Sequence, residues 1–145
     1  MAKPVSPETL ARFKEGFECW NRDELDLMQG MYAEEGVFDL SAVFPDAEPI
    51  QGHQNMRRYW IEMQDTWAGI RTDPLEAFDL GGGLYVVDLR LRGQGQQSGV
   101  DVDQRFAMLY TIRTEDEKIV RAQLFPDVAA AISAAESSRS QAAGG

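Results

Sequence analysis

A chain of 145 residues, of which 43% are hydrophobic and 26% charged, has the length and composition of one globular domain with a sizeable core. Its formal net charge of −10 disfavours nucleic acid and anionic membrane surfaces as partners, because both attract basic patches. The chain contains no apolar run near the roughly 20 residues that cross a bilayer, no signal-peptide pattern in residues 1–10, and a single cysteine, Cys19. We therefore expect a cytoplasmic domain with neither a nucleic-acid nor a membrane partner.

The N-terminal part of the chain is predicted to be helical. Ser6 followed by Pro7 is an N-cap pattern, and the helix that it begins runs to about Trp20 with one apolar stripe. Asp23 is a candidate cap for a second, shorter helix. The inward-facing residues expected on this second helix are Leu25, Met28, Met31 and Tyr32.

The next segment combines an acid, two prolines and the only histidine of the chain. Alternation over residues 37–41 predicts a short strand with Asp39 on one side and Phe38 on the other. The prolines then interrupt regular structure. A third helix is expected over about residues 55–67, so His53 lies close to its start. An acid therefore stands in the middle of an apolar strand, shortly before a histidine.

After the third helix, the hydrophobic period changes from about 3.6 to about 2, which predicts consecutive strands joined by short turns. The expected class is therefore α+β. Three N-terminal helices, with a short strand between the second and third, pack on a curved antiparallel sheet to form a cone-shaped α+β barrel. We expect a single domain over residues 1–136, with a short helix near its end and a disordered C-terminal tail over 137–145. The predicted strands cover residues 70–80, 84–92, 100–113 and 118–125.

An apolar pocket is expected inside such a cone. A strongly twisted sheet curls, and helices laid across its concave face leave the wide end open. Large aromatic and methionine side chains suit an apolar small molecule, although most such residues in any protein simply form the core. The residues predicted to bind this ligand are Trp20, Tyr32, Phe38, Trp60, Met63, Gln104, Phe106 and Met108.

Several short motifs in this order are similar to a known family. They are the runs 20–23 (WNRD) and 31–35 (MYAEE), the Gly52-His53 helix start, the glycine-rich loop 93–99 and the strand 118–121 (KIVR). Over about residues 8–135 the chain resembles the SnoaL-like branch of the nuclear transport factor 2-like superfamily. That superfamily includes polyketide cyclases, ketosteroid isomerases, epoxide hydrolases, dehydratases and non-catalytic binding modules. The resemblance also implies a homodimer through the open sheet face, by residues such as Ala107, Leu109 and Thr111.

Asp39 is the candidate general base, because the resemblance places it on the strand where ketosteroid isomerases carry theirs. A carboxylate in an apolar cleft has its charged form disfavoured, so we expect its pKa to be raised. The alternative is a structural acid at a strand end, solvated or paired with an arginine. The positions of that family's oxyanion site fall near Glu15 and near Met108 or Leu109, which lack the expected groups, so steroid isomerisation is disfavoured.

His53 and Tyr110 complete the predicted catalytic set. His53 is a candidate proton shuttle, or else a histidine bonded to a nearby loop. Tyr110 is a candidate hydrogen-bond donor. An epoxide-hydrolase set of two acids and an arginine is disfavoured, because Gln123 stands where the second acid would align and an amide cannot replace it. We expect no metal, because one histidine and one distant cysteine give no ligand spacing, and no cofactor.

The sequence thus predicts a SnoaL-like protein that binds an apolar small molecule. If it is catalytic, it is a cofactor-free isomerase, cyclase or dehydratase that acts on an apolar carbonyl compound with Asp39 as general base. The alternative is a non-catalytic ligand-binding or dimerisation domain in which Asp39 is structural.

Overall fold

The computed structural model describes residues 2–66, 70–94, 99 and 101–144, with backbone only for 140–144. The helices are α1 (Pro7–Asn21), α2 (Leu25–Gly30), α3 (His53–Thr66) and α4 (Val128–Gly144). The strands are β1 (Lys3–Pro4), β2 (Tyr32–Asp39), β3 (Ile50–Gln51), β4 (Arg71–Gly81), β5 (Leu84–Gln94), β6 (Asp101–Ile112) and β7 (Ile119–Phe125).

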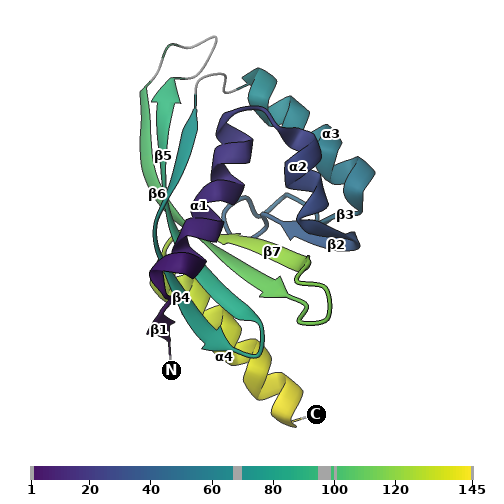
Figure 1. Ribbon diagram of the computed structural model, residues 1–145, viewed down its shortest axis with the longest axis vertical. Coiled ribbons are helices and arrows are strands. Elements are labelled where there is room, and N and C mark those ends of the chain that lie inside the picture. Colours follow the sequence, from purple (N-terminus) through teal and green to yellow (C-terminus); the bar gives the residue numbers. More distant parts are fainter. Residues whose placement is uncertain (1, 67–69, 95–98, 100, 145) are drawn as a thin grey trace.

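One curved sheet organises the molecule, with strand order β1-β4-β5-β6-β7-β2-β3. Strands β4 to β7 form the expected antiparallel meander, and β2 joins β7 in parallel. Figure 1 shows α1, α2 and α3 on one side of the sheet and α4 on the other. The predicted α+β class is confirmed. No helix in the described ranges is long and apolar enough to span a membrane.

The start of α1 follows from local chemistry. The Ser6 side chain accepts a hydrogen bond from the backbone N–H of Thr9 at 3.2 Å, and Pro7 opens the helix, as predicted. The cap expected at Asp23 is wrong: Glu24 occupies the N-cap of α2 without a side-chain hydrogen bond, and Asp23 has a left-handed backbone with φ of 61°. Asp23 therefore turns the chain between the two helices.

A side-chain clamp fixes the end of α1 to the sheet. Asn21 Nδ2 donates to the carbonyl of Thr72 at 2.9 Å, and Asn21 Oδ1 accepts from the N–H of the same residue at 2.9 Å. Thr72 is buried near the start of β4. The clamp satisfies two backbone groups that would otherwise lack partners, and so it sets where α1 lies over the sheet.

The sheet separates two hydrophobic clusters. The larger one lies between the sheet and helices α1, α2 and α3, and the smaller one lies under α4. Ala131 and Ala135 of α4 are buried in the smaller cluster together with Ala107 and Leu109 of β6. The expected dimer contact through Ala107 and Leu109 is therefore wrong, because the chain's own C-terminal helix covers them.

Helix α4 also extends further than expected. It continues to Gly144, through most of the segment 137–145 for which we expected disorder, and Arg139 donates hydrogen bonds to the carbonyls of Leu80 and Gly81. A helix whose inward residues are mainly alanine can lie close to the sheet. The single-domain boundary at residue 136 stays a prediction.

Candidate functional site

The interior between the helices and the sheet gathers aromatic residues from distant parts of the chain. Trp60 on α3 packs against Tyr32, with ring centroids 5.5 Å apart, and against the edge of Phe38 at 6.3 Å. Phe13 of α1 stacks on Tyr110 of β6 at 5.7 Å. One cluster therefore unites five of the predicted site residues: Tyr32, Phe38, Trp60, Met108 and Tyr110.

The remaining predicted ligand-binding residues lie nearer the surface. Trp20 at the end of α1 is half-buried and packs against this cluster, and its carbonyl accepts a hydrogen bond from Gln64 of α3 at 3.3 Å. Met63 and Phe106 are half-buried, whereas Gln104 is exposed. The binding roles of all these residues stay predictions.

The cluster contains one buried polar atom without a hydrogen-bond partner among the described residues. Trp60 is only 1% exposed, and its Nε1 has no hydrogen-bond partner in the described part of the chain. Leaving such a buried donor unpaired costs about 1–3 kcal/mol. The unpaired group lies beside Tyr32, on the same side of the sheet as Tyr110. A hydrogen-bond acceptor placed here would therefore be stabilised.

The hydroxyls of Tyr32 and Tyr110 are neutral donors in this interior. Burial raises the pKa of Tyr32, an effect that its hydrogen bonding with Tyr110 only partly offsets. Burial also raises the pKa of Tyr110, and its interaction with Tyr32 raises it further. When two hydroxyls share one hydrogen bond, one of the two protons remains available to a further acceptor.

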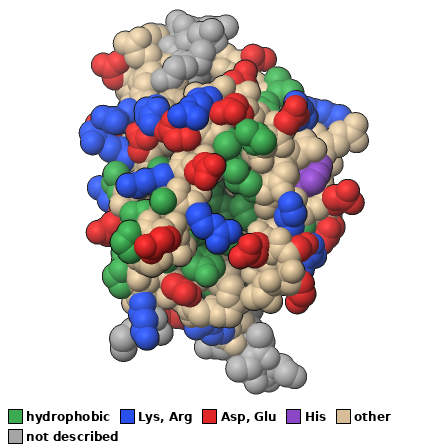
Figure 2. All heavy atoms as spheres, viewed as in Figure 1, with side chains coloured by type: hydrophobic (Ala, Val, Ile, Leu, Met, Phe, Trp, Pro, Cys, Tyr) green, Lys and Arg blue, Asp and Glu red, His purple; other side chains and the backbone are tan. Residues whose placement is uncertain are grey.

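Helix α1 covers the cluster only in part. Cys19 is the one residue of α1 that is buried. The apolar stripe of α1 packs against the cluster, but its side chains are only half-buried. Apolar surface therefore stays accessible between α1 and the rest of the domain. Figure 2 shows a hollow lined by hydrophobic side chains near the middle of this face, with charged side chains around it. The half-buried residues of the stripe are Leu10, Phe13, Phe17 and Trp20.

Asp39 lies on the opposite face of the sheet. Phe38 pairs with Ala122 of β7 in the inner cluster, so the alternation of β2 turns Asp39 outward, beside its register partner Gln123. Its Oδ1 accepts hydrogen bonds from the N–H of Ser41 at 2.9 Å and from the Ser41 hydroxyl at 2.7 Å. Its Oδ2 accepts from Arg121 at 3.1 Å. The carboxylate is thus tied to a turn and to an arginine.

The expected rise in the pKa of Asp39 is wrong. Burial acts to raise this pKa, but the hydrogen bonds from Ser41 and the charge of Arg121 together hold it below its ordinary value. An ionised carboxylate in an ion pair is a weak base. This geometry agrees with the alternative interpretation of Asp39 as a structural acid paired with an arginine. It gives no support to Asp39 as a base for the interior.

His53 is bound to the backbone of β2. Its Nε2 lies 2.8 Å from the carbonyl of Tyr32, and because a carbonyl only accepts, that nitrogen carries the proton. The contact joins the first residue of α3 to β2. This bond gives His53 a structural contact with a strand rather than with the loop that we expected, and its role as a proton shuttle stays a prediction.

Asp88 of β5 and Asp103 of β6 form ion pairs across these two strands on the outer face. Arg90 binds Asp103 at 2.8 Å, and Arg105 binds Asp88, so the four side chains form a cross-strand charge ladder. Within the described ranges, no group of three histidine, cysteine or acidic side chains is arranged to hold a metal.

The contacts of three important residues were not predicted from the sequence. Ser41 had a signal, because a serine two residues after an aspartate often closes a hydrogen-bonded turn. Arg121 had no signal. The apolar stripe of the first helix placed Phe13 on its inward side but did not indicate its contact with Tyr110. The partners Asp39 and Tyr110 are distant in sequence, and only the sheet order and the placement of α1 bring these contacts about.

Comparison with known proteins identifies the domain and its fold. The model of the SnoaL-like domain family matches residues 13–122 of this chain. TerC co-crystallised with polyporic acid is 16% identical, with a TM-score of 0.70, over 86% of this chain and 95% of that one. RV0760c from Mycobacterium tuberculosis in complex with estradiol-17beta-hemisuccinate is 15% identical, with a TM-score of 0.68, over 86% and 96%. A protein with a ketosteroid isomerase-like fold from Catenulispora acidiphila, in complex with trimethylamine, is 13% identical, with a TM-score of 0.69, over 86% and 88%. No curated protein matches this chain in sequence.

Proposed function

This chain belongs to the SnoaL-like domain family, and on that basis we propose that it binds an apolar small molecule in the interior beneath α1. The ligand enters along the half-buried stripe of α1 and presents a hydrogen-bond acceptor to the buried end. There the acceptor receives hydrogen bonds from Trp60 Nε1 and from the hydroxyl of Tyr32.

The unpaired Nε1 of Trp60 is the observation that carries this proposal. Buried polar groups in folded proteins are nearly always hydrogen-bonded, so a donor that lacks a partner in the free chain is a natural contact for a ligand. The neighbouring hydroxyls of Tyr32 and Tyr110 add donors on the same side of the sheet. The surrounding side chains are aromatic or aliphatic, which suits a ligand with an apolar body.

The acceptor of the ligand is a neutral oxygen in this proposal. Among the described residues, Asp39 and Thr72 are the buried polar or charged ones, so no buried lysine or arginine is present to pair with a carboxylate. An ionised group would lose its hydration without gaining a counter-charge. A carbonyl or hydroxyl oxygen is therefore favoured. The small molecules found with structures of this fold, polyporic acid in TerC among them, support a ligand-binding role.

Cofactor-free isomerisation, cyclisation or dehydration of a carbonyl compound is the second candidate function. The polar hydroxyls of Tyr32 and Tyr110 favour it, because neutral donors stabilise an oxygen on which negative charge develops. The base of such a reaction would have to be a group other than Asp39, which lies across the sheet. Ligand binding requires no such group and is the function that the geometry supports best.

Binding of a neutral aromatic ketone tests the proposal. Prodan, whose emission depends on the polarity of its surroundings, would be titrated into the chain and into the variants Trp60→Phe and Asp39→Asn. We expect Trp60→Phe to weaken binding roughly tenfold, the effect of one lost hydrogen bond, and Asp39→Asn to leave it unchanged. A matched naphthalene without the carbonyl should bind both Trp60 forms equally. The proposal would be contradicted if Trp60→Phe weakened the binding of both compounds equally, or if no form of the chain bound prodan.

A further inference from the structure

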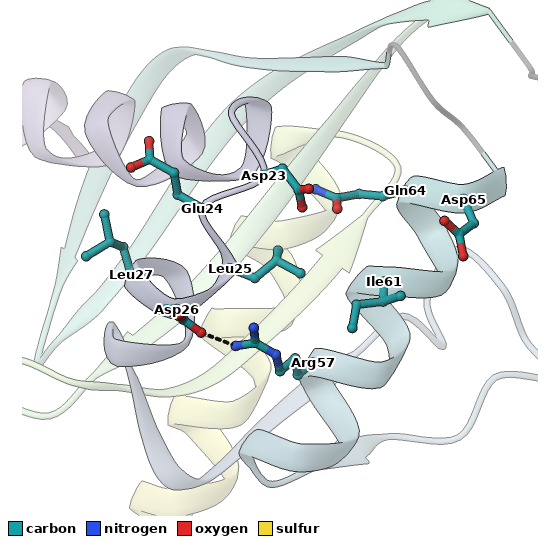
Figure 3. A pocket seen from close by; sticks show the side chains of 9 residues that line it. All are labelled: Asp23, Glu24, Leu25, Asp26, Leu27, Arg57, Ile61, Gln64 and Asp65. Carbon is teal, nitrogen blue, oxygen red and sulfur yellow. Dashed lines mark hydrogen bonds and ion pairs between the residues drawn. The ribbon is translucent and has the colours of Figure 1, made fainter.

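A second apolar surface lies outside the proposed ligand interior, in a groove of about 540 Å³ between α2 and α3. Leu25, Leu27 and Ile61 are its hydrophobic lining. Figure 3 shows Leu25 and Ile61 pointing toward each other across the groove, with the Asp26–Arg57 pair at one end and Asp23 and Gln64 at the other. We call this surface the α2–α3 groove.

Two large hydrophobic side chains of the α2–α3 groove are unusually exposed. Leu27 is 57% exposed and Ile61 is 44% exposed, and only Leu25 beneath them is buried. Neither exposed residue belongs to the hydrophobic cluster of the interior. Exposed hydrophobic residues that line one groove are typical of a surface that another molecule covers.

The rim of the α2–α3 groove is acidic. Four carboxylates and one guanidinium line it, which gives a net charge of −3. Arg57 is already engaged by Asp26, with 2.5 Å between its Nη1 and Oδ1 of the aspartate. Asp23 and Asp65 have no cationic partner among the described residues, and Glu24 has only a distant one, Arg22, at 3.9 Å. The charges that remain uncompensated are therefore negative and lie around an apolar centre.

We propose that the α2–α3 groove docks a short basic segment of a partner protein. One or two apolar side chains of the segment pack between Leu25 and Ile61, and its lysines or arginines face Asp23 and Asp65. Charge complementarity selects this occupant, because an acidic rim repels nucleic acid and anionic lipid. A second copy of this chain is disfavoured by its net charge of −10.

Fluorescence anisotropy with a designed peptide tests this proposal. The probe is a short fluorescein-labelled peptide in which leucines one helical turn apart are flanked by lysines. The groove variants are Leu27→Ser, Ile61→Ser and Asp65→Lys. The matched controls are Leu75→Ser, an exposed leucine on β4, and Glu136→Lys, an exposed acid on α4. Circular dichroism on each variant establishes that it is folded.

We expect each groove variant to bind the probe roughly tenfold more weakly than the unchanged chain, and the controls to bind it unchanged. Binding should also weaken as salt screens the charges. The proposal is overturned if groove variants bind like controls, or if a peptide with serines in place of leucines binds equally well. It is also overturned if hexylammonium, a small apolar cation, displaces the probe at the same concentration as the unlabelled peptide. A further contradicting result is sedimentation that shows the chain pairing with itself through this groove.

Discussion

Arg121 of β7 donates a hydrogen bond to Asp39 of β2 across 3.1 Å, on the face of the sheet opposite Phe38. The two residues are distant in sequence, and the parallel pairing of their strands brings them together. Asp39 in turn accepts both hydrogen bonds that close the turn at Ser41. This acid therefore anchors the end of β2, and the chemistry of the interior depends on other residues.

Replacing Arg121 with methionine should destabilise the chain by about 1 kcal/mol at pH 7. The value is small because the arginine side chain is partly exposed and its pairing is screened by solvent. Urea unfolding of both forms measures it. The exposed pair of Arg12 with Glu117, 3.5 Å apart, supplies the control: Arg12→Met should have almost no effect.

The loss of stability caused by Arg121→Met should depend on pH. The folded chain lowers the pKa of Asp39, so the unfolded chain takes up a proton first as the pH falls. The stabilisation is therefore complete above about pH 4, the ordinary value for an aspartate, and disappears as the pH falls through the folded-state pKa. If the difference in unfolding free energy between the unchanged chain and Arg121→Met grew as the pH fell, Arg121 would not be stabilising the ionised carboxylate.

Asn21→Ala should cost about 2 kcal/mol of unfolding free energy. It removes both hydrogen bonds to Thr72 and leaves buried backbone groups without partners. Asn55→Ala is the matched control, because that side chain makes a single exposed bond to the Gln51 carbonyl at 3.0 Å, and it should change stability by less than about 0.5 kcal/mol. Equal effects of the two substitutions in chemical denaturation would mean that the clamp does not hold α1.

The buried tyrosines should make the fold sensitive to alkaline pH. Burial raises the pKa of Tyr32 and of Tyr110 above the ordinary value near 10, so the unfolded chain loses those protons first. Their contribution to stability is complete below about pH 10 and is lost as the pH rises beyond it. Tyr110→Phe should therefore flatten the fall in melting temperature above that pH. An unchanged slope would argue that Tyr110 is not buried.

Part of this fold follows from local patterns. The cap at Ser6, the alternation that separates Phe38 from Asp39, and the change of period after the third helix each depend on neighbouring residues. Those patterns also led to Tyr32 and Trp60, because large aromatic residues on inward faces meet in the core of a curved sheet.

The errors concern pairings between distant segments. Tyr32 was expected on the inward face of the second helix but begins β2, because its strand joins β7 in parallel. The same pairing turns Asp39 toward Arg121 and away from the interior. Nothing near Leu109 in the sequence indicates that α4 will cover it. Local propensity carries no information about such contacts, since tertiary packing decides them.

Deleting residues 127–145 should make the chain self-associate. Without α4, hydrophobic residues of the outer sheet face become exposed, and strands with an exposed apolar face tend to pair. Sedimentation velocity of the deletion variant and the full chain at equal concentration measures this. Deleting residues 140–145 alone is the control and should leave the number of chains per particle unchanged. The same oligomeric state for all three forms would show that α4 does not shield this face. The newly exposed residues are Val86, Ala107, Leu109 and Phe125.

The central claim is that the buried donor of Trp60 contacts a ligand's oxygen. Proton–nitrogen correlation spectra resolve the indole N–H signals of the chain's three tryptophans, and Trp60→Phe identifies the signal of Trp60. We predict that prodan shifts this signal downfield, as a new hydrogen bond does, and that the matched naphthalene without a carbonyl does not. A Trp60 signal that stays in place while prodan is bound would contradict the account.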